Sequence, residues 1–136
     1  MKLLLIYADK MRYKTALKTL ESEPDLDEEK SFVGVLVGFI HLEEADETDS
    51  SGVETKLVKN LKWAARKNGT KKIILHSFAH LAETKASPEF AKKTLDGAQK
   101  RLIASGYEAY QTPFGYFLDL EITAPGKPSA RIFKSF

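Results

Sequence analysis

The sequence contains no cysteine, so disulfides and zinc sites built from thiolates are excluded. No apolar run approaches the roughly 20 residues that a helix needs to cross a bilayer. The apolar run in "MKLLLIYADK" spans only about five residues, which is too short for a signal peptide and is typical of a buried strand. We therefore expect an intracellular, cytoplasmic protein without a membrane segment.

Glycine-rich phosphate-binding motifs are missing too, because neither G-x-G-x-x-G nor a Walker sequence occurs. The net charge of +2 is too small to indicate a nucleic-acid-binding protein by itself. The charges are uneven, however, with acidic residues in 21–30 and 43–54 and a basic stretch in 56–72. A chain of 136 residues, 43% of them hydrophobic and 29% charged, has the size and composition of one globular domain.

The hydrophobic pattern predicts a mixed α/β domain. Apolar runs rich in β-branched and aromatic residues indicate strands, and a 3.6-residue periodicity indicates helices. The polar segment 9–30, which includes "SEPDLDEE", is expected to form a loop. Two helices in crossover positions imply a partly parallel sheet with right-handed connections, and the last three strands should add an antiparallel section. The expected strands are 2–7, 32–43, 71–78, 107–111, 115–123 and 130–133, and the expected helices are 53–68 and 87–106.

The first expected helix has two contrasting faces. Its apolar face should be buried, whereas its basic face either contacts an RNA backbone or is simply solvated. Trp63 lies near the centre of the basic face, where its indole can rest on lysine stems. The apolar face holds Leu57, Val58, Leu61, Ala64 and Ala65, and the basic face holds Lys56, Lys59, Lys62, Arg66 and Lys67.

The stretch "KKIILHSFAHLAE" carries two histidines at a strand end. Zinc ligation by His76 and His80 is disfavoured, because the helical metalloprotease motif needs glutamate where Ser77 stands and His41 is the only other histidine. Nucleophilic catalysis by Ser77 is also disfavoured, since no G-x-S-x-G elbow surrounds it. A serine that hydrogen-bonds the backbone at a strand end is the simpler interpretation.

A second stretch, "QTPFGYFLDL", combines an aromatic residue with two conformationally unusual neighbours. Pro113 and Gly115 flank Phe114, so the backbone is bent and can approach a ligand closely. A hairpin or strand entry with aromatic core residues accounts for the same pattern. The residues alone leave both interpretations open.

Four motifs in a consistent order give the chain a resemblance to a known family. They are "LLLIYAD", "VLVGFIHLEEAD", "FAHL" and "TPFGYF", and they extend over nearly all 136 residues. The chain resembles the N-terminal editing domain of archaeal threonyl-tRNA synthetases. The resemblance implies a D-aminoacyl-tRNA deacylase-like fold, with residues 1–136 as one domain that forms the N-terminal part of a longer synthetase-related chain.

The resemblance also implies an activity with a clear physical rationale. A synthetic site that binds threonine also admits serine, because the missing methyl group is worth only about 1–3 kcal/mol of discrimination. A second site is then expected to hydrolyse L-seryl-tRNA(Thr), while the extra methyl group keeps threonine out. The implied partners are the acceptor end of tRNA(Thr), a second copy of the domain in a homodimer, and the remaining synthetase domains. No metal or other cofactor is expected.

In the family, the "FAHL" and "PFGY" segments line the editing pocket. The resemblance therefore assigns His80 as the catalytic histidine, holding substrate or water and not serving as an indispensable base, and assigns no role to His76. Lys56, Lys59, Lys62 and Arg66 are expected to contact tRNA phosphates. The expected substrate-binding residues are Leu42, Ser77, Phe78, Ala79, Phe114, Gly115, Tyr116 and Phe117.

The chain departs from the family pattern at several polar positions. Phe117 and Leu118 stand where family members carry tyrosine and lysine, Arg131 replaces an acidic residue, and Ala124 replaces a cysteine. One explanation is that backbone groups and the tRNA 2′-hydroxyl position the attacking water, so that shape matters more than side chains. The alternatives are a catalytically silent tRNA-binding or dimerisation module, and a D-aminoacyl-tRNA deacylase.

Overall fold

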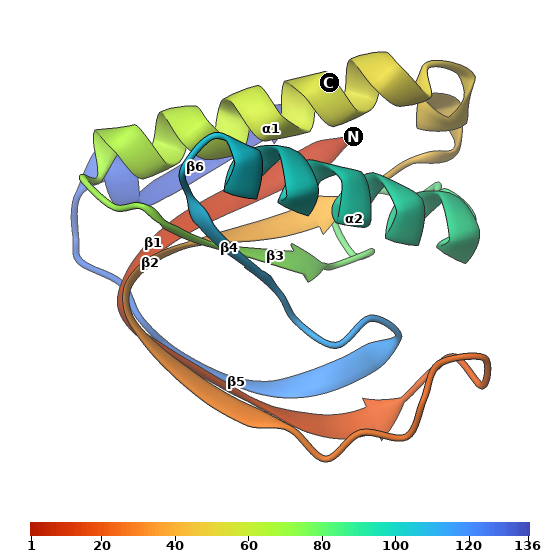
Figure 1. Ribbon diagram of the computed structural model, residues 1–136, viewed down its shortest axis with the longest axis horizontal. Helices are drawn as coiled ribbons and strands as arrows, with labels where there is room; N and C mark the ends of the chain where they lie inside the picture. Colours follow the sequence, from red (N-terminus) through yellow and green to blue (C-terminus); the bar gives the residue numbers. More distant parts are fainter.

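A computed structural model describes residues 1–136 and contains one six-stranded sheet covered by two long helices (Figure 1). The strands run in the order β4-β3-β2-β1-β5, and β6 also pairs with β1. The expected mixed α/β architecture is therefore confirmed. The elements are β1 (Lys2–Lys18), β2 (Glu29–His41), η1 (Glu44–Thr48), α1 (Ser50–Lys67), β3 (Lys72–Ser77), α2 (Pro88–Ala104), β4 (Glu108–Gln111), β5 (Tyr116–Thr123), η2 (Pro128–Ala130) and β6 (Arg131–Ser135).

The first strand is far longer than its apolar run predicted. The prediction of a loop over 9–30 is wrong, because β1 continues to Lys18 and β2 already begins at Glu29. The physical reason is a period-2 pattern within the polar segment: Met11 and Tyr13 are buried, while Lys10 and Lys14 are exposed. Only the turn between the two strands remains irregular.

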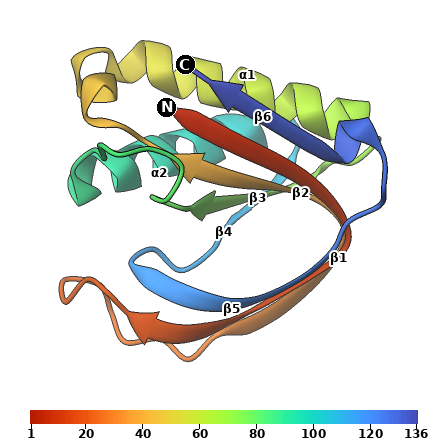
Figure 2. The same ribbon diagram turned by 180° about the vertical axis from the view of Figure 1, so that it is seen from behind.

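The length of β1 shapes the whole sheet. One edge of β1 pairs antiparallel with β2 from Lys2 to Lys14, and the other edge is divided between two strands. Residues 2–6 pair with β6, and residues 10–18 pair with β5 across a register shift between Thr15 and Leu17. As Figure 2 shows, β1 and β2 curve together, so that β5, which pairs with the far part of β1, lies opposite the layer of β3 and β4. The sheet is thus curled, with an open end.

The parallel part of the sheet arises from the two helices. α1 connects β2 to β3, α2 connects β3 to β4, and both of these strand pairs are parallel, as expected. The expectation that all of the last three strands are antiparallel is wrong for β4 and holds for β5 and β6, which pair antiparallel with β1. β4 follows a helical crossover, and such a connection returns the chain in the same direction.

Two apolar clusters fill the two faces of the sheet. The larger one lies beneath α1 and α2 and includes all five residues of the predicted apolar face of α1. The smaller one lies within the curl and includes Met11, Tyr13, Phe39 and Ile74. The helix ends follow the sequence signals: the Ser87 side chain accepts a hydrogen bond from the N–H of Phe90, and α1 ends before a glycine with φ of +64°.

The core of α1 generates a stability prediction. Leu61 is fully buried between α1 and the sheet, so Leu61→Ala should lower the free energy of unfolding by about 2–5 kcal/mol through lost apolar contact and a residual cavity. Ile103→Ala on α2 is the matched control, because 54% of that side chain is exposed and its loss should cost much less. Urea denaturation measures both values, and equal losses would contradict the assignment of the core.

Candidate active site

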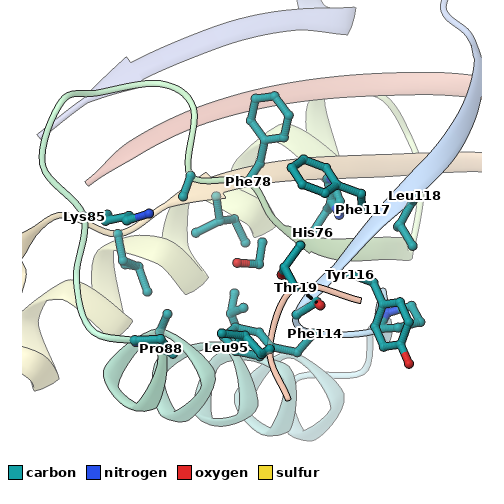
Figure 3. A pocket seen from close by; sticks show the side chains of 18 of the residues that line it. Thr19, His76, Phe78, Lys85, Pro88, Leu95, Phe114, Tyr116, Phe117 and Leu118 are labelled. Carbon is teal, nitrogen blue, oxygen red and sulfur yellow. Dashed lines mark hydrogen bonds between the residues drawn. The ribbon is translucent and has the colours of Figure 1, made fainter. Parts of the chain in front are cut away.

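A pocket of about 470 Å³ opens at the carboxyl ends of β2 and β3 (Figure 3). Ile40 and Leu42 contribute from the end of β2, and Ser77 contributes from the end of β3. The start of α2 and the first residues of β5 close the other sides. This is where an α/β sheet ordinarily places a ligand, because the loops that follow parallel strands diverge there. Of the 21 residues that line the pocket, 13 are hydrophobic, so its walls are mostly apolar.

The structure brings the residues of the two motifs to this one pocket. Residues 78–80 of "FAHL" supply one wall and "PFGYF" supplies the facing wall, although about thirty residues separate them in the sequence. All nine residues assigned to catalysis or substrate binding lie among the lining residues: Leu42, Ser77, Phe78, Ala79, His80, Phe114, Gly115, Tyr116 and Phe117.

A series of contacting aromatic rings runs from Phe39, outside the pocket lining, through four residues that line the pocket. Phe39 meets the rings of both His76 and Phe78 edge-on, with centroids 5.2 Å apart in each pair. Phe78 meets His80 at 5.0 Å, and His80 stacks on Phe117 at 6.0 Å. His80 is exposed and has no hydrogen-bond partner in the protein, so its ring is oriented by aromatic packing and its nitrogens are free for a ligand.

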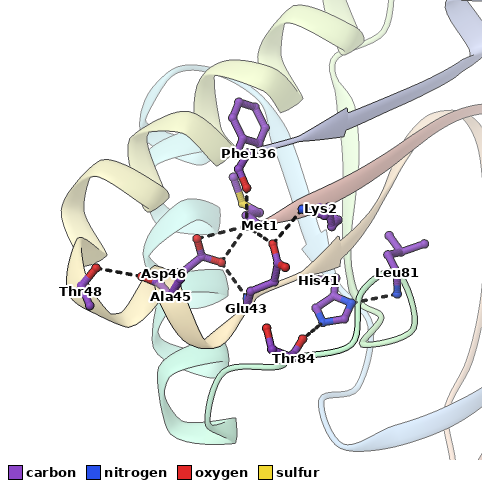
Figure 4. A network of polar contacts seen from close by, with 10 residues as sticks. All are labelled: Met1, Lys2, His41, Glu43, Ala45, Asp46, Thr48, Leu81, Thr84 and Phe136. Atoms are coloured by element: carbon purple, nitrogen blue, oxygen red, sulfur yellow. Dashed lines mark hydrogen bonds and ion pairs between the residues drawn. The ribbon is translucent and has the colours of Figure 1, made fainter.

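His41 fixes the segment that carries "FAHL". The imidazole is 1% exposed; its Nδ1 accepts a hydrogen bond from the N–H of Leu81 at 2.9 Å, and its Nε2 lies 2.7 Å from the carbonyl oxygen of Thr84 (Figure 4). Since Nδ1 accepts, Nε2 carries the proton and donates to Thr84, so the ring is neutral. Backbone bonds at both ends, from Phe78 N–H to the Ile40 oxygen and from Ala86 N–H to that of Leu42, complete the attachment to β2.

The facing wall depends on a tight turn at Gly115. Its φ is +78°, and a Cβ atom there would lie 3.0 Å from the Cβ of Leu20. The carbonyl of Gly115 accepts hydrogen bonds from the N–H and hydroxyl of Thr19. The Tyr116 hydroxyl donates to the Pro24 carbonyl and accepts from a neighbouring N–H, which leaves its hydroxyl engaged away from the pocket. This wall therefore offers the pocket backbone and apolar groups.

His76 was given no role from the sequence, yet it lies in the pocket wall. Its Nδ1 is 2.9 Å from the hydroxyl oxygen of Thr112, and both side chains are buried. Burial, assisted by repulsion from the nearby His80, lowers the pKa of His76 from 6.5 to about 4. His76 is therefore uncharged at neutral pH.

Several further lining residues were not identified from the sequence. Thr19 and Leu20 come from the turn after β1, and Lys85 and Pro88 come from the approach to α2. No spacing signal links these positions to the two motifs, because they reach the pocket only through the curl of β1 and the path of the 78–86 segment. Lys85 forms no ion pair and supplies the one cationic side chain among the lining residues.

The three histidines do not gather at one point. His41 lies outside the pocket lining and uses both ring nitrogens on the backbone, while His76 and His80 lie within the lining. No group of three or more His, Asp or Glu side chains has a metal-binding arrangement. The protein also has no helix that is both long and apolar enough to span a membrane.

The predicted tRNA-binding residues lie on α1, which contributes nothing to the pocket lining. None of them is in an ion pair, and Glu54, the single acidic residue of α1, pairs with Arg101 instead. Trp63 is half-buried between the ammonium groups of Lys67 and Lys134, whose Nζ atoms lie 5.5 and 4.8 Å from its ring centroid. Lys59, Asn60, Lys62, Trp63, Arg66 and Lys134 line a shallow depression, termed here the basic surface.

Comparison with solved structures supports the expected fold class. The c-Myc DNA unwinding element binding protein superposes with a TM-score of 0.68 over 100% of this chain and 99% of that one, at 11% sequence identity. At such low identity the likeness concerns the fold alone. It supports the mixed α/β fold that the sequence predicted, over the full length of the chain.

Comparison of sequences identifies the family. The chain is 32% identical to the threonine--tRNA ligase of Methanosphaera stadtmanae and 33% identical to that of Thermococcus kodakarensis, with 99% of the chain matched in each case. It spans 22% of the length of these curated relatives. The model of the archaea-specific editing domain of threonyl-tRNA synthetase matches residues 1–136. The chain therefore belongs to the family of archaea-specific threonyl-tRNA synthetase editing domains.

Proposed function

We propose that this domain hydrolyses the ester of L-serine mischarged on tRNA(Thr). The observation that carries the proposal is the convergence of "FAHL" and "PFGYF" on one mostly apolar pocket in a chain of this family. A pocket of about 470 Å³ is large enough for a terminal nucleoside and a small amino acid. Closely fitted walls can admit serine and exclude the extra methyl group of threonine, which completes a double sieve.

The composition of the pocket favours hydrolysis by positioning. The Tyr116 hydroxyl is already bonded to the turn after β1, and Phe117 and Leu118 supply no polar group. Backbone groups around Ser77, Ala79 and Gly115 would hold the ester, and the tRNA 2′-hydroxyl would position the attacking water. Mostly apolar walls strengthen such dipolar contacts once a bound substrate displaces water from the pocket. His80 would hold substrate or water at the wall.

Single-turnover deacylation tests this activity directly. L-Seryl-tRNA(Thr) should be hydrolysed at least tenfold faster than L-threonyl-tRNA(Thr), because one methyl group in a fitted pocket is worth roughly 10–200-fold. D-Seryl-tRNA(Thr) serves as the third substrate. Preferential loss of the D-ester would establish a D-aminoacyl-tRNA deacylase instead. Retained tRNA binding without hydrolysis of any ester would identify a silent docking module, which the apolar Phe117 and Leu118 would explain.

Substitution of His80 separates positioning from acid–base catalysis. If His80 only holds substrate or water, His80→Ala should lower the single-turnover rate partially, by about tenfold, as expected for one lost hydrogen bond. A positioned general base contributes about 10²–10⁴-fold, so a loss in the upper part of that range would contradict the positioning mechanism. The exposed His80 side chain can be removed with little effect on folding, which thermal unfolding of the variant verifies.

We also propose that the basic surface contacts tRNA phosphates. The double variant Lys59→Glu/Lys62→Glu should weaken tRNA(Thr) binding at 50 mM salt and flatten its salt dependence, because released counterions drive such contacts. Lys10→Glu/Lys14→Glu is the matched control, since both lysines are exposed on β1, outside the basic surface. Filter binding over a salt series measures the affinities. Equal tRNA affinities for the wild type and the Lys59/Lys62 variant would refute the contact.

The proposed setting of the domain is the cytoplasm, where it would act with the remaining domains of a threonyl-tRNA synthetase. We infer that association from the curated relatives, because the matched region makes up only 22% of their length. We further propose that two copies pair. β6 is bonded to β1 along one edge alone, and Phe133 on this strand is 55% exposed, so the strand offers both backbone and apolar contacts to a second copy.

A further inference from the structure

His76 is the one buried titratable side chain of the pocket for which the proposed mechanism has no use. It is 5% exposed, lies at the end of β3, and is packed edge-on against Phe39. Burying an imidazole in an apolar wall costs free energy unless its ring nitrogens form hydrogen bonds, so a functional reason for this histidine is worth seeking. Nδ1 has a hydrogen-bond partner in the Thr112 hydroxyl, whereas Nε2 has no partner within the protein.

The partner of Nδ1 determines which nitrogen carries the proton. The Thr112 hydroxyl lies 2.9 Å from Nδ1 and has no other hydrogen-bond partner. If Nδ1 carried the proton and donated it, the hydroxyl proton of the buried threonine would be left without an acceptor. If the hydroxyl donates to Nδ1 instead, that proton is satisfied and the imidazole proton resides on Nε2. We assign the second arrangement on this ground.

Nε2 is accessible from the pocket. It forms no hydrogen bond within the protein, yet no buried polar side-chain atom of the chain is left without a partner. Nε2 is therefore in contact with solvent, and His76 lines the pocket. The result is an uncharged N–H donor in a mostly apolar wall, held in place by Thr112 on one side and by the rings of Phe39 and Phe78 on the others.

We propose that His76 is a substrate-binding residue that donates a hydrogen bond from Nε2–H to an oxygen of the aminoacyl ester. The proposal rests on the function proposed above and adds to it a side chain that contacts the acyl group. His80 is exposed and its ring has no hydrogen-bond partner in the protein, whereas His76 is buried and is hydrogen-bonded to Thr112, just after β4. A fixed donor is the kind of group that orients a small polar ligand in an apolar pocket.

The ionisation of His76 is consistent with this role. Because burial lowers the pKa of its imidazole to about 4, the ring stays neutral at neutral and mildly acidic pH. A neutral donor places no positive charge beside the α-ammonium group of the substrate. The lowered pKa of His76 also makes the stability of the domain depend on pH. The unfolded chain binds the imidazole proton more readily than the folded domain, so the free energy of unfolding decreases as the pH falls from 6.5 toward 4.

Two substitutions test the hydrogen bond. His76→Phe keeps an aromatic ring but has no donor, so kcat/KM for L-seryl-tRNA(Thr) should fall about tenfold or more. His76→Gln places an amide N–H near the position of Nε2 and should restore most of the rate. Thermal unfolding of both variants reports on folding. Full activity of a folded His76→Phe variant, with an active wild type, would overturn this inference and leave the proposed function standing.

A binding measurement tests the contact without hydrolysis. The probe is an adenosine that carries L-serine through a 3′-amide in place of the ester, which this domain should bind without rapid cleavage. The imidazole ¹⁵N resonances of His76 in the wild-type domain should indicate a proton on Nε2, and the Nε2 signal should shift when the probe is added but not with adenosine alone.

A proton on Nδ1, or no shift on binding of the probe, would overturn the inference even if His76→Phe failed to fold. If the wild type neither hydrolyses an ester nor binds the probe, the proposed function fails and this inference with it.

Discussion

The pairing of β1 with three different strands is the constraint on which the rest of the structure depends. One edge of this strand is paired with β2 from Lys2 to Lys14, so the two strands bend together, and its other edge is occupied first by β6 and then by β5. Because backbone hydrogen bonds are costly to leave unmade in a buried sheet, the curl cannot flatten without breaking one of these ladders. The curl brings β5 opposite the end of β3, and the pocket exists only because of that approach.

The pocket walls are held by contacts that leave few polar groups free. His41 uses both ring nitrogens to hold the segment of His80, and the Tyr116 hydroxyl is bonded to the turn after β1. What remains available to a ligand is backbone, aromatic surface and a small number of polar side chains. In the proposed function, such a site would discriminate by shape, because closely packed apolar walls can exclude a methyl group although they offer few groups to bind a hydroxyl.

The pocket and the basic surface occupy separate parts of the molecule. No residue of α1 lines the pocket, and the lysines of α1 form no ion pairs with the rest of the domain. A substrate that reached both would have to be long and negatively charged over much of its length, as a tRNA is. Electrostatic attraction acts over roughly 10 Å at moderate salt, so a surface of this kind can guide such a molecule without contributing to its chemistry.

By itself the sequence determined the order of the elements, the C-terminal end of α1, both ends of α2, the buried face of α1 and the family, because these depend on local periodicity, capping residues and short motifs. The sequence pattern predicted a start of α1 at Val53, whereas the helix begins at Ser50 after the N-cap Asp49. It also placed nine residues in one site, through the resemblance of "FAHL" and "PFGYF". Only the tertiary structure decided that residues 9–18 continue β1, that β4 is parallel, and that Thr112 fixes the ring of His76. Each of these outcomes depends on partners distant in sequence. A polar segment becomes a strand when a neighbouring strand satisfies its backbone, and a histidine acquires a tautomer when a hydroxyl 36 residues away approaches it.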